Sequence, residues 1–331
     1  MSGEPVSPAN PPSSGRRSPF ALEGRAAPGL YPAGWFMAIG GAAAALVGAS
    51  AGGGPGAGIL FGIGMLLAAL GLGAAAGGQA LQRRAAGTAG YAGPSPLLVF
   101  AAVVAGTYAV GTALGLLLPP LAPQVDVLLS ALVLGSIGIG ALAILVVGSG
   151  ALSWRDLGFR LPATAEGGLI GDVAWGIALG APTLFIGSGL AAGLVGLLGT
   201  TPAPTLPLTP DPAGALLNLV AAVVVAPLWE EIFFRGYATT AWAATLGSRA
   251  AIIRGALFFA FIHVLTVSAG SFDEGVRLAL IGFVARLPVG LVLGWVFLRR
   301  RSLAAPVALH ATYNALPLLL YLALGSAVQP G

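Results

Sequence analysis

The 331-residue chain has no cysteine, no lysine and few charged side chains of either sign. The absence of cysteine excludes disulfide bonds, thiolate metal sites and a cysteine nucleophile. Charged residues make up 8% of the chain, against about 25% in a typical soluble domain. Hydrophobic residues make up 57%, and the mean hydropathy is +0.93. This composition predicts an all-α fold, a polytopic bundle of transmembrane helices.

Every basic side chain is an arginine, because the 15 Lys and Arg residues include no lysine. The sequence pI of about 10.0 therefore reflects arginines. In a membrane protein these are expected in loops, where they report topology, and we predict no nucleic-acid partner. The 52 glycines would let helices approach closely where packing drives their association. No repeat of fixed period is evident.

Long apolar runs divide the chain. Nine of them are long enough to cross a hydrocarbon core of about 30 Å, so we expect about nine helices, with eight as the alternative. They cover roughly 33–52, 55–78, 96–119, 126–149, 168–199, 214–239, 252–272, 276–298 and 303–325.

Three regions follow from this pattern. Residues 1–30 are rich in Pro, Ser and Gly and lack the apolar core of a cleavable signal peptide, which predicts a disordered cytosolic tail. Residues 31–95 form a membrane extension of two helices with a polar linker at 79–95. Residues 96–331 form the core of the protein, and the motifs described below lie within 150–325.

Arginines in short loops mark the cytosolic side of a membrane protein. With the N-terminus inside, the expected cytosolic loops contain nine arginines, whereas the opposite loops contain almost none. The nine are Arg83, Arg84, Arg155, Arg160, Arg249, Arg254, Arg299, Arg300 and Arg301. We therefore predict an integral membrane protein with a cytoplasmic N-terminus, and with nine helices the C-terminus lies outside.

The chain has only two histidines, His263 and His310, and both lie in apolar segments. The segment 214–239 adds the adjacent acids Glu230 and Glu231. Ionisable residues within a membrane are costly, so they indicate a functional site by default. Glu231 and Arg235 are four residues apart on one helical face and should form an ion pair, which leaves Glu230, about 100° away, to project into the bundle.

The same spacing joins Phe259 to His263 and His310 to Asn314. His263 lies nine residues after Arg254, and His310 lies nine residues after Arg301. At a rise of 1.5 Å per residue, both imidazoles are expected about 13 Å from the cytosolic boundary. We therefore predict that the two histidines meet Glu230 at one level of the bundle.

These residues resemble, in order, three motifs of the CPBP family of intramembrane proteases. That family includes the type II CAAX prenyl endopeptidases and bacterial proteins linked to bacteriocin immunity and abortive infection. Glu230-Glu231-x-x-x-Arg235 resembles the first motif, Phe259-x-x-x-His263 the second and His310-x-x-x-Asn314 the third. The resemblance extends over residues 150–325. Arg286 is unusual within it and has no role that the sequence supplies.

The resemblance implies an intramembrane endopeptidase. Glu230 would activate water, His263 would orient or deprotonate it, and His310 with Asn314 would support the water or polarise the carbonyl group. Glu231, Arg235 and Phe259 would support these groups. Glu230, His263 and His310 could also ligate Zn²⁺, since His₂Glu is a known catalytic zinc set; hydrolysis without a metal is the favoured reading. No cofactor is otherwise implied.

The expected partners are the lipid bilayer and a membrane-associated peptide or protein substrate. The arginine-only, Ala- and Gly-rich composition suggests a bacterium, and hence its plasma membrane, where prenylated substrates are not expected. The main alternative is a non-catalytic immunity or scaffold protein of the same family. A proton-coupled transporter would require inverted repeats, which are not found, and bis-histidine haem ligation does not account for the Glu pair or Asn314.

Overall fold

The computed structural model describes residues 21, 22, 25–160, 168–204, 206, 207, 209, 211–265 and 267–328. These residues form nine continuous helices and one two-residue antiparallel pairing, β1 (Ala21–Leu22) with β2 (Arg25–Ala26). Seven are single α-helices: α1 (Leu30–Ser50), α2 (Pro55–Ala85), α3 (Pro96–Leu117), α5 (Gly168–Leu198), α9 (Ser248–Ile262), α10 (Phe272–Arg300) and α11 (Ala304–Val328). One continues from α4 (Pro123–Ala141) into the π-helical segment η1 (Leu142–Val147). The last consists of α6 (Pro212–Leu219), the π-helical segment η3 (Val220–Val225), α7 (Ala226–Glu231), the π-helical segment η4 (Ile232–Thr239) and α8 (Thr240–Leu246).

The predicted all-α bundle of about nine helices is confirmed for the described residues. Seven of these helices are long and apolar enough to cross a membrane, so the chain is an integral membrane protein. The remaining two are α9 and α11. α9 has 15 residues, which at 1.5 Å per residue is well short of about 30 Å.

Two predicted boundaries are wrong. α9 ends at Ile262 rather than near residue 272, because the chain leaves the helix in a turn at residues 263–265, and α10 begins at Phe272. α2 continues to Ala85, so part of the predicted linker 79–95 is helical. The predicted disordered tail, 1–30, falls mostly outside the described residues.

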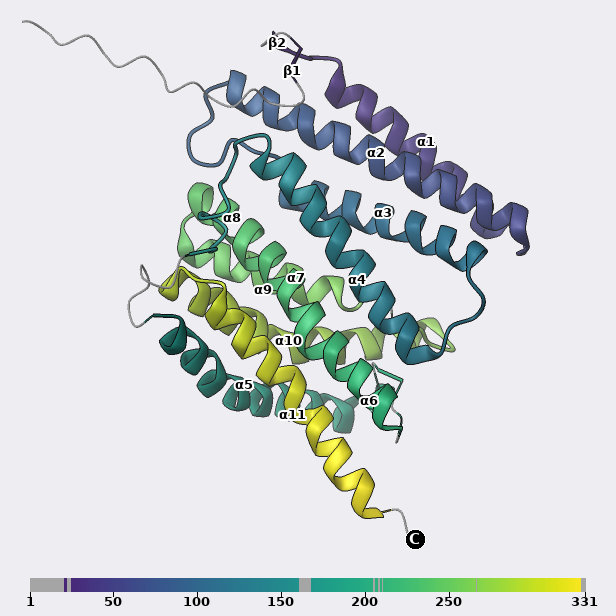
Figure 1. Cartoon of the computed structure of the whole chain (residues 1–331), viewed down its shortest axis with the longest axis vertical. Helices are drawn as coiled ribbons and strands as arrows, with labels where there is room; N and C mark the ends of the chain where they lie inside the picture. Colours follow the sequence, from purple (N-terminus) through teal and green to yellow (C-terminus); the bar gives the residue numbers. More distant parts are fainter. Residues whose placement is uncertain are drawn as a thin grey trace, which may run out of the picture.

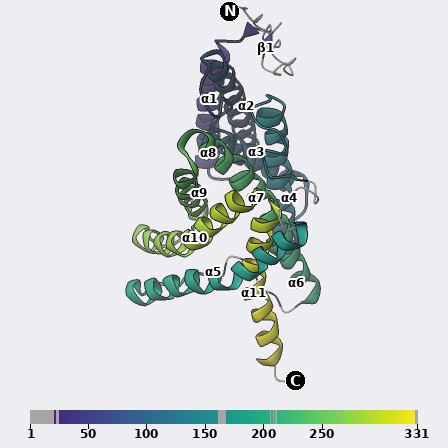
Figure 2. The ribbon, with the colours of Figure 1, turned by 90° about the vertical axis from the view of Figure 1, so that its left-hand side faces the viewer.

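The helices are stacked from the N-terminal pair to the C-terminal helix. Figure 1 shows α1 and α2 along one side of the bundle, α3 and α4 next, and α5 with α11 on the opposite side. Figure 2 shows the same order after a 90° rotation, with α10 and α5 running side by side. α7 and α9, which carry Glu230 and Phe259, lie in the middle of this stack, and α11, which carries His310 and Asn314, contacts α7.

Glycines let α1 and α2 pack backbone against backbone. A Cβ atom placed on Gly34 or Gly41 of α1 would lie 2.6 Å from a carbonyl oxygen of α2, on Gly71 and Gly64 respectively. Gly48 continues the series, so the glycines of α1 recur every seven residues. This seven-residue spacing of Gly34, Gly41 and Gly48 was not evident in the sequence, because other glycines lie near them. Small residues at the contact allow the close approach that drives helix association in a bilayer.

The helix that runs from α6 through α8 is the central helix of the stack, and it is buried over the segment that follows Glu231. Every residue of its π-helical segment η4 is buried, and π-helical turns are frequent at functional sites. Gly236 allows the 148–160 loop to approach, because a Cβ there would lie 2.7 Å from the Leu157 carbonyl oxygen. The Tyr237 hydroxyl donates to the Pro94 carbonyl oxygen at 2.9 Å. The same helix therefore fixes the loop that joins the N-terminal extension to the core.

Candidate active site

Glu231 and Arg235 form the ion pair that their spacing predicts. Arg235 Nη1 donates to Glu231 Oε1 at 3.0 Å, and both side chains are fully buried. The guanidinium also lies over the ring of Phe259, with Cζ 4.4 Å from the ring centroid. Arg235 Nη2 adds a long contact of 3.5 Å to the Gly290 carbonyl oxygen of α10. Arg235 thus connects three helices while it balances the charge of Glu231.

Glu231 has a second partner that sequence spacing does not indicate. His310 Nδ1 lies 2.8 Å from Glu231 Oε1 across 79 residues of sequence. A carboxylate oxygen can only accept, so Nδ1 is the protonated nitrogen of that ring. The imidazole is held in one orientation, with its Nε2 turned toward Glu230.

His263 is oriented in the same way by a different acceptor. Its Nδ1 donates to the Phe259 carbonyl oxygen at 2.7 Å, so Nε2 carries the lone pair in the neutral ring. Phe259 also packs against this imidazole, with ring centroids 4.4 Å apart, and against His310 at 5.7 Å. Phe259 therefore contacts both imidazole rings and the guanidinium of Arg235.

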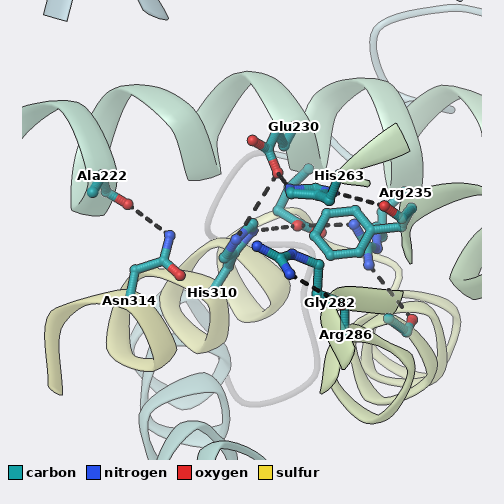
Figure 3. A network of polar contacts seen from close by, with 11 residues as sticks. Ala222, Glu230, Arg235, His263, Gly282, Arg286, His310 and Asn314 are labelled. Atoms are coloured by element: carbon teal, nitrogen blue, oxygen red, sulfur yellow. Dashed lines mark hydrogen bonds and ion pairs between the residues drawn. The ribbon is translucent and has the colours of Figure 1, made fainter. Parts of the chain in front are cut away.

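Glu230 lies between the two Nε2 atoms. Its Oε2 is 3.7 Å from His263 Nε2 and 4.0 Å from His310 Nε2 (Figure 3). These spacings exceed a direct hydrogen bond, and polar groups at such distances are commonly bridged by water. The Glu230 side chain is 16% exposed, whereas that of Glu231 is 0% exposed. Glu230 Oε2 itself is buried and has no hydrogen-bond partner among the described residues.

Asn314 lies on the same helix as His310 but faces another partner. Its Nδ2 donates to the Ala222 carbonyl oxygen in η3 at 2.8 Å, and Figure 3 shows this contact to one side of the Glu230 cluster. No side-chain hydrogen bond joins Asn314 to Glu230, His263 or His310 among the described residues. The amide has a second N–H donor that this bond leaves free.

Arg286 of α10 joins the cluster, although sequence analysis gave it no role. Figure 3 shows its guanidinium pointing toward His310 and Glu230, with Nη1 3.0 Å from the Gly282 carbonyl oxygen. Within the described part of the chain no carboxylate lies within 4.0 Å of this guanidinium. The signal in the sequence was an arginine inside an apolar span, which marks a functional position by default.

The arrangement does not fit a metal centre. Glu230, His263 and His310 are the donor types of a catalytic zinc site. Among the described residues, however, no group of three or more such side chains converges well enough to hold an ion. The hydrogen bonds of both Nδ1 atoms leave each Nε2 available, and the Glu230 carboxylate stands 3.7 and 4.0 Å from these two nitrogens. We therefore derive no step through a metal.

One comparison with known proteins gives a match. Residues 212–316 match the family model described as type II CAAX prenyl endopeptidase Rce1-like. The matched range contains all three motifs, from Glu230 to Asn314, and is shorter than the range 150–325 of the resemblance. No curated protein and no solved structure matches the chain.

Proposed function

The chain carries an Rce1-like domain of the type II CAAX prenyl endopeptidase family at residues 212–316, and from this premise we propose that it is an intramembrane endopeptidase. Its substrate is a membrane-associated peptide or protein, and Glu230 activates the water that hydrolyses the peptide bond. The observation that carries this proposal is the pairing of Glu230 Oε2 with two imidazoles that both present Nε2.

The donor and acceptor roles favour a bound water in the first step. When Glu230 is ionised and His263 is neutral, Oε2 and Nε2 are both acceptors, so a water can donate one hydrogen to each. Its oxygen lone pair then faces the substrate carbonyl carbon. As the C–O bond forms, the water proton passes to Glu230, which acts as a general base.

His310 stabilises the negative charge that develops on the carbonyl oxygen of the substrate. In its protonated form Nε2 donates to that oxygen, and Glu231, bonded to Nδ1–H, stabilises the imidazolium. The free N–H of Asn314 is a second candidate donor. Such preorganised donors are strong in a site that excludes bulk water. Collapse of the tetrahedral intermediate breaks the C–N bond, and Glu230 returns the proton to the leaving nitrogen, giving a carboxylic acid and an amine.

Loss of the general base tests this proposal. N- and C-terminal peptides would be compared in membranes from cells that express wild type, Glu230→Gln or the control Glu274→Gln. Glu274 is exposed at the start of α10, where its side chain accepts from the Gly270 N–H. New termini should appear with wild type and with the control, and Glu230→Gln should lower their formation about 10²- to 10⁴-fold.

Two results of the same experiment would reject the mechanism. Identical peptide profiles from all three folded proteins would favour a non-catalytic immunity or scaffold protein. Stoichiometric zinc in the purified wild type, lost together with cleavage on chelation, would replace the metal-free mechanism with a metalloprotease.

A further inference from the structure

A cavity of about 1070 Å³ lies apart from the Glu230 cluster, at the end of the bundle where α2 ends and α9 begins. It is bounded by the 86–95 loop, the start of α3, α8, α9 and Phe283 of α10. This volume lies at the upper limit of the volumes that are usual for small-molecule sites. None of the residues used in the proposed hydrolysis lines it, so the cavity requires its own explanation.

The charged residues that line the cavity are all basic. Arg83 and Arg254 both line it, and its lining, which consists of described residues, contains no Asp or Glu. Arg83 Nη1 donates to the neutral Gly93 carbonyl oxygen at 2.7 Å. Arg254 is exposed and lies over the Trp242 ring, with Cζ 5.7 Å from the centroid. Neither guanidinium forms an ion pair within the described residues, so two positive charges face the cavity uncompensated.

The rest of the lining is largely apolar. Along α9 it passes from Arg254 to Leu257 and Phe261, and Leu97 of α3 and Phe283 of α10 also line the cavity. Arg254 and Phe261 are seven residues apart, about 10 Å along the helix axis. Leu97, Leu257 and Phe261 are exposed despite their size. Along α9 the lining therefore changes from cationic at Arg254 to apolar at Leu257 and Phe261, in the direction that we predict to lead into the membrane.

We propose that this cavity binds an anionic phospholipid, with its phosphodiester group at Arg83 and Arg254 and an acyl chain along Leu257 and Phe261. Basic pockets between transmembrane helices bind anionic headgroups in this way, and Trp242 is a residue typical of the interfacial level. A zwitterionic lipid fits less well, since its ammonium group would meet two arginines and no carboxylate. The inference does not depend on the proposed proteolysis.

Lipid binding to the purified full-length protein tests the proposal. Native mass spectrometry in detergent would compare palmitoyl-oleoyl phosphatidylglycerol with the phosphatidylcholine of the same chains. An arginine near an anionic lipid surface is worth about a fivefold change in affinity, so two predict a preference of roughly 30-fold for phosphatidylglycerol. Arg83→Gln/Arg254→Gln should abolish the preference. The control Arg155→Gln/Arg299→Gln removes the same charge from exposed positions outside the cavity and should retain it.

A second variant tests the apolar part of the lining. Leu257→Trp leaves the charge unchanged and fills the cavity, so it should weaken phosphatidylglycerol binding while the helix content and thermal midpoint of the protein stay near wild type. Excess glycerol phosphate should not displace the lipid. Equal affinity for the two lipids, equal behaviour of the two double variants, or displacement by glycerol phosphate alone would each overturn the proposal.

Discussion

At the scale of single residues, adjacent glutamates acquire different chemistry from their surroundings. Glu231 is fully buried and bonded to Arg235 and His310, so its carboxylate positions these two side chains. Glu230 retains partial exposure and faces two imidazole nitrogens without a direct hydrogen bond. Glu231 therefore holds in place the side chains that surround Glu230.

We predict that the charge of Arg286 contributes to turnover. Its positive charge faces the region where the proposed reaction develops negative charge. Removing a direct oxyanion donor costs about 10²- to 10³-fold in turnover, and a more distant charge should cost less. Arg286→Met is therefore expected to lower kcat about tenfold, whereas Arg286→Lys, which keeps the charge, should retain most activity. Cleavage of the substrate identified with wild type measures both. A Met variant as active as wild type would remove Arg286 from the site.

At the scale of elements, two helix irregularities position the site. π-helical turns precede and follow the α7 segment that carries Glu230 and Glu231. The early end of α9 leaves His263 at the helix terminus, where its Nδ1 still bonds the last turn at Phe259. The imidazole therefore stands at the edge of the helix, in reach of the central helix and of α11.

The α1–α2 pair gives a prediction at the element scale. Gly41→Leu places a side chain against the α2 backbone, where even a Cβ would lie 2.6 Å from the Gly64 oxygen. Overpacking costs about 1–3 kcal/mol, so the thermal midpoint in detergent should fall. Gly40 is the matched control, since nothing lies within 4 Å of a Cβ there. A fall in midpoint for Gly40→Leu equal to that for Gly41→Leu would argue against the helix pairing.

At the scale of the whole molecule, the arginine-bearing loops occur at one end of the bundle. The end of α2, the turn between α8 and α9 and the start of α11 lie on the left in Figure 1. This distribution agrees with the positive-inside pattern of the sequence. It places the arginine pair of the lipid cavity on the side that we predict to be cytoplasmic.

Cysteine labelling tests that orientation directly, because the chain has no native cysteine. Ser153→Cys lies in the loop before α5 and Thr201→Cys in the loop after it, and both positions are exposed. In intact bacterial cells a membrane-impermeant maleimide should label Thr201→Cys and leave Ser153→Cys unlabelled until the cells are lysed. The reverse pattern would place the N-terminus outside.

The nine helices follow from the sequence because each must satisfy its own backbone hydrogen bonds in lipid and so appears as an apolar run. The ion pair between Glu231 and Arg235 follows from helical spacing, and the equal distances of His263 and His310 from Arg254 and Arg301 predict that both imidazoles lie near Glu230. Each of these features depends on residues within one helix, or on a helix and the membrane boundary. Local periodicity is sufficient to determine them.

The contact between His310 and Glu231, the inward direction of Arg286, the bond from Asn314 to Ala222 and the lipid cavity depend on how separate helices rotate and pack. In a bilayer all apolar faces are nearly equivalent to lipid, so packing between small residues and buried polar bonds selects the helix orientations. That selection joins residues up to 146 positions apart, as in the bond from Tyr91 to Tyr237. The sequence by itself determined which helices exist and which side chains they carry, and only the tertiary structure decided which of those side chains meet.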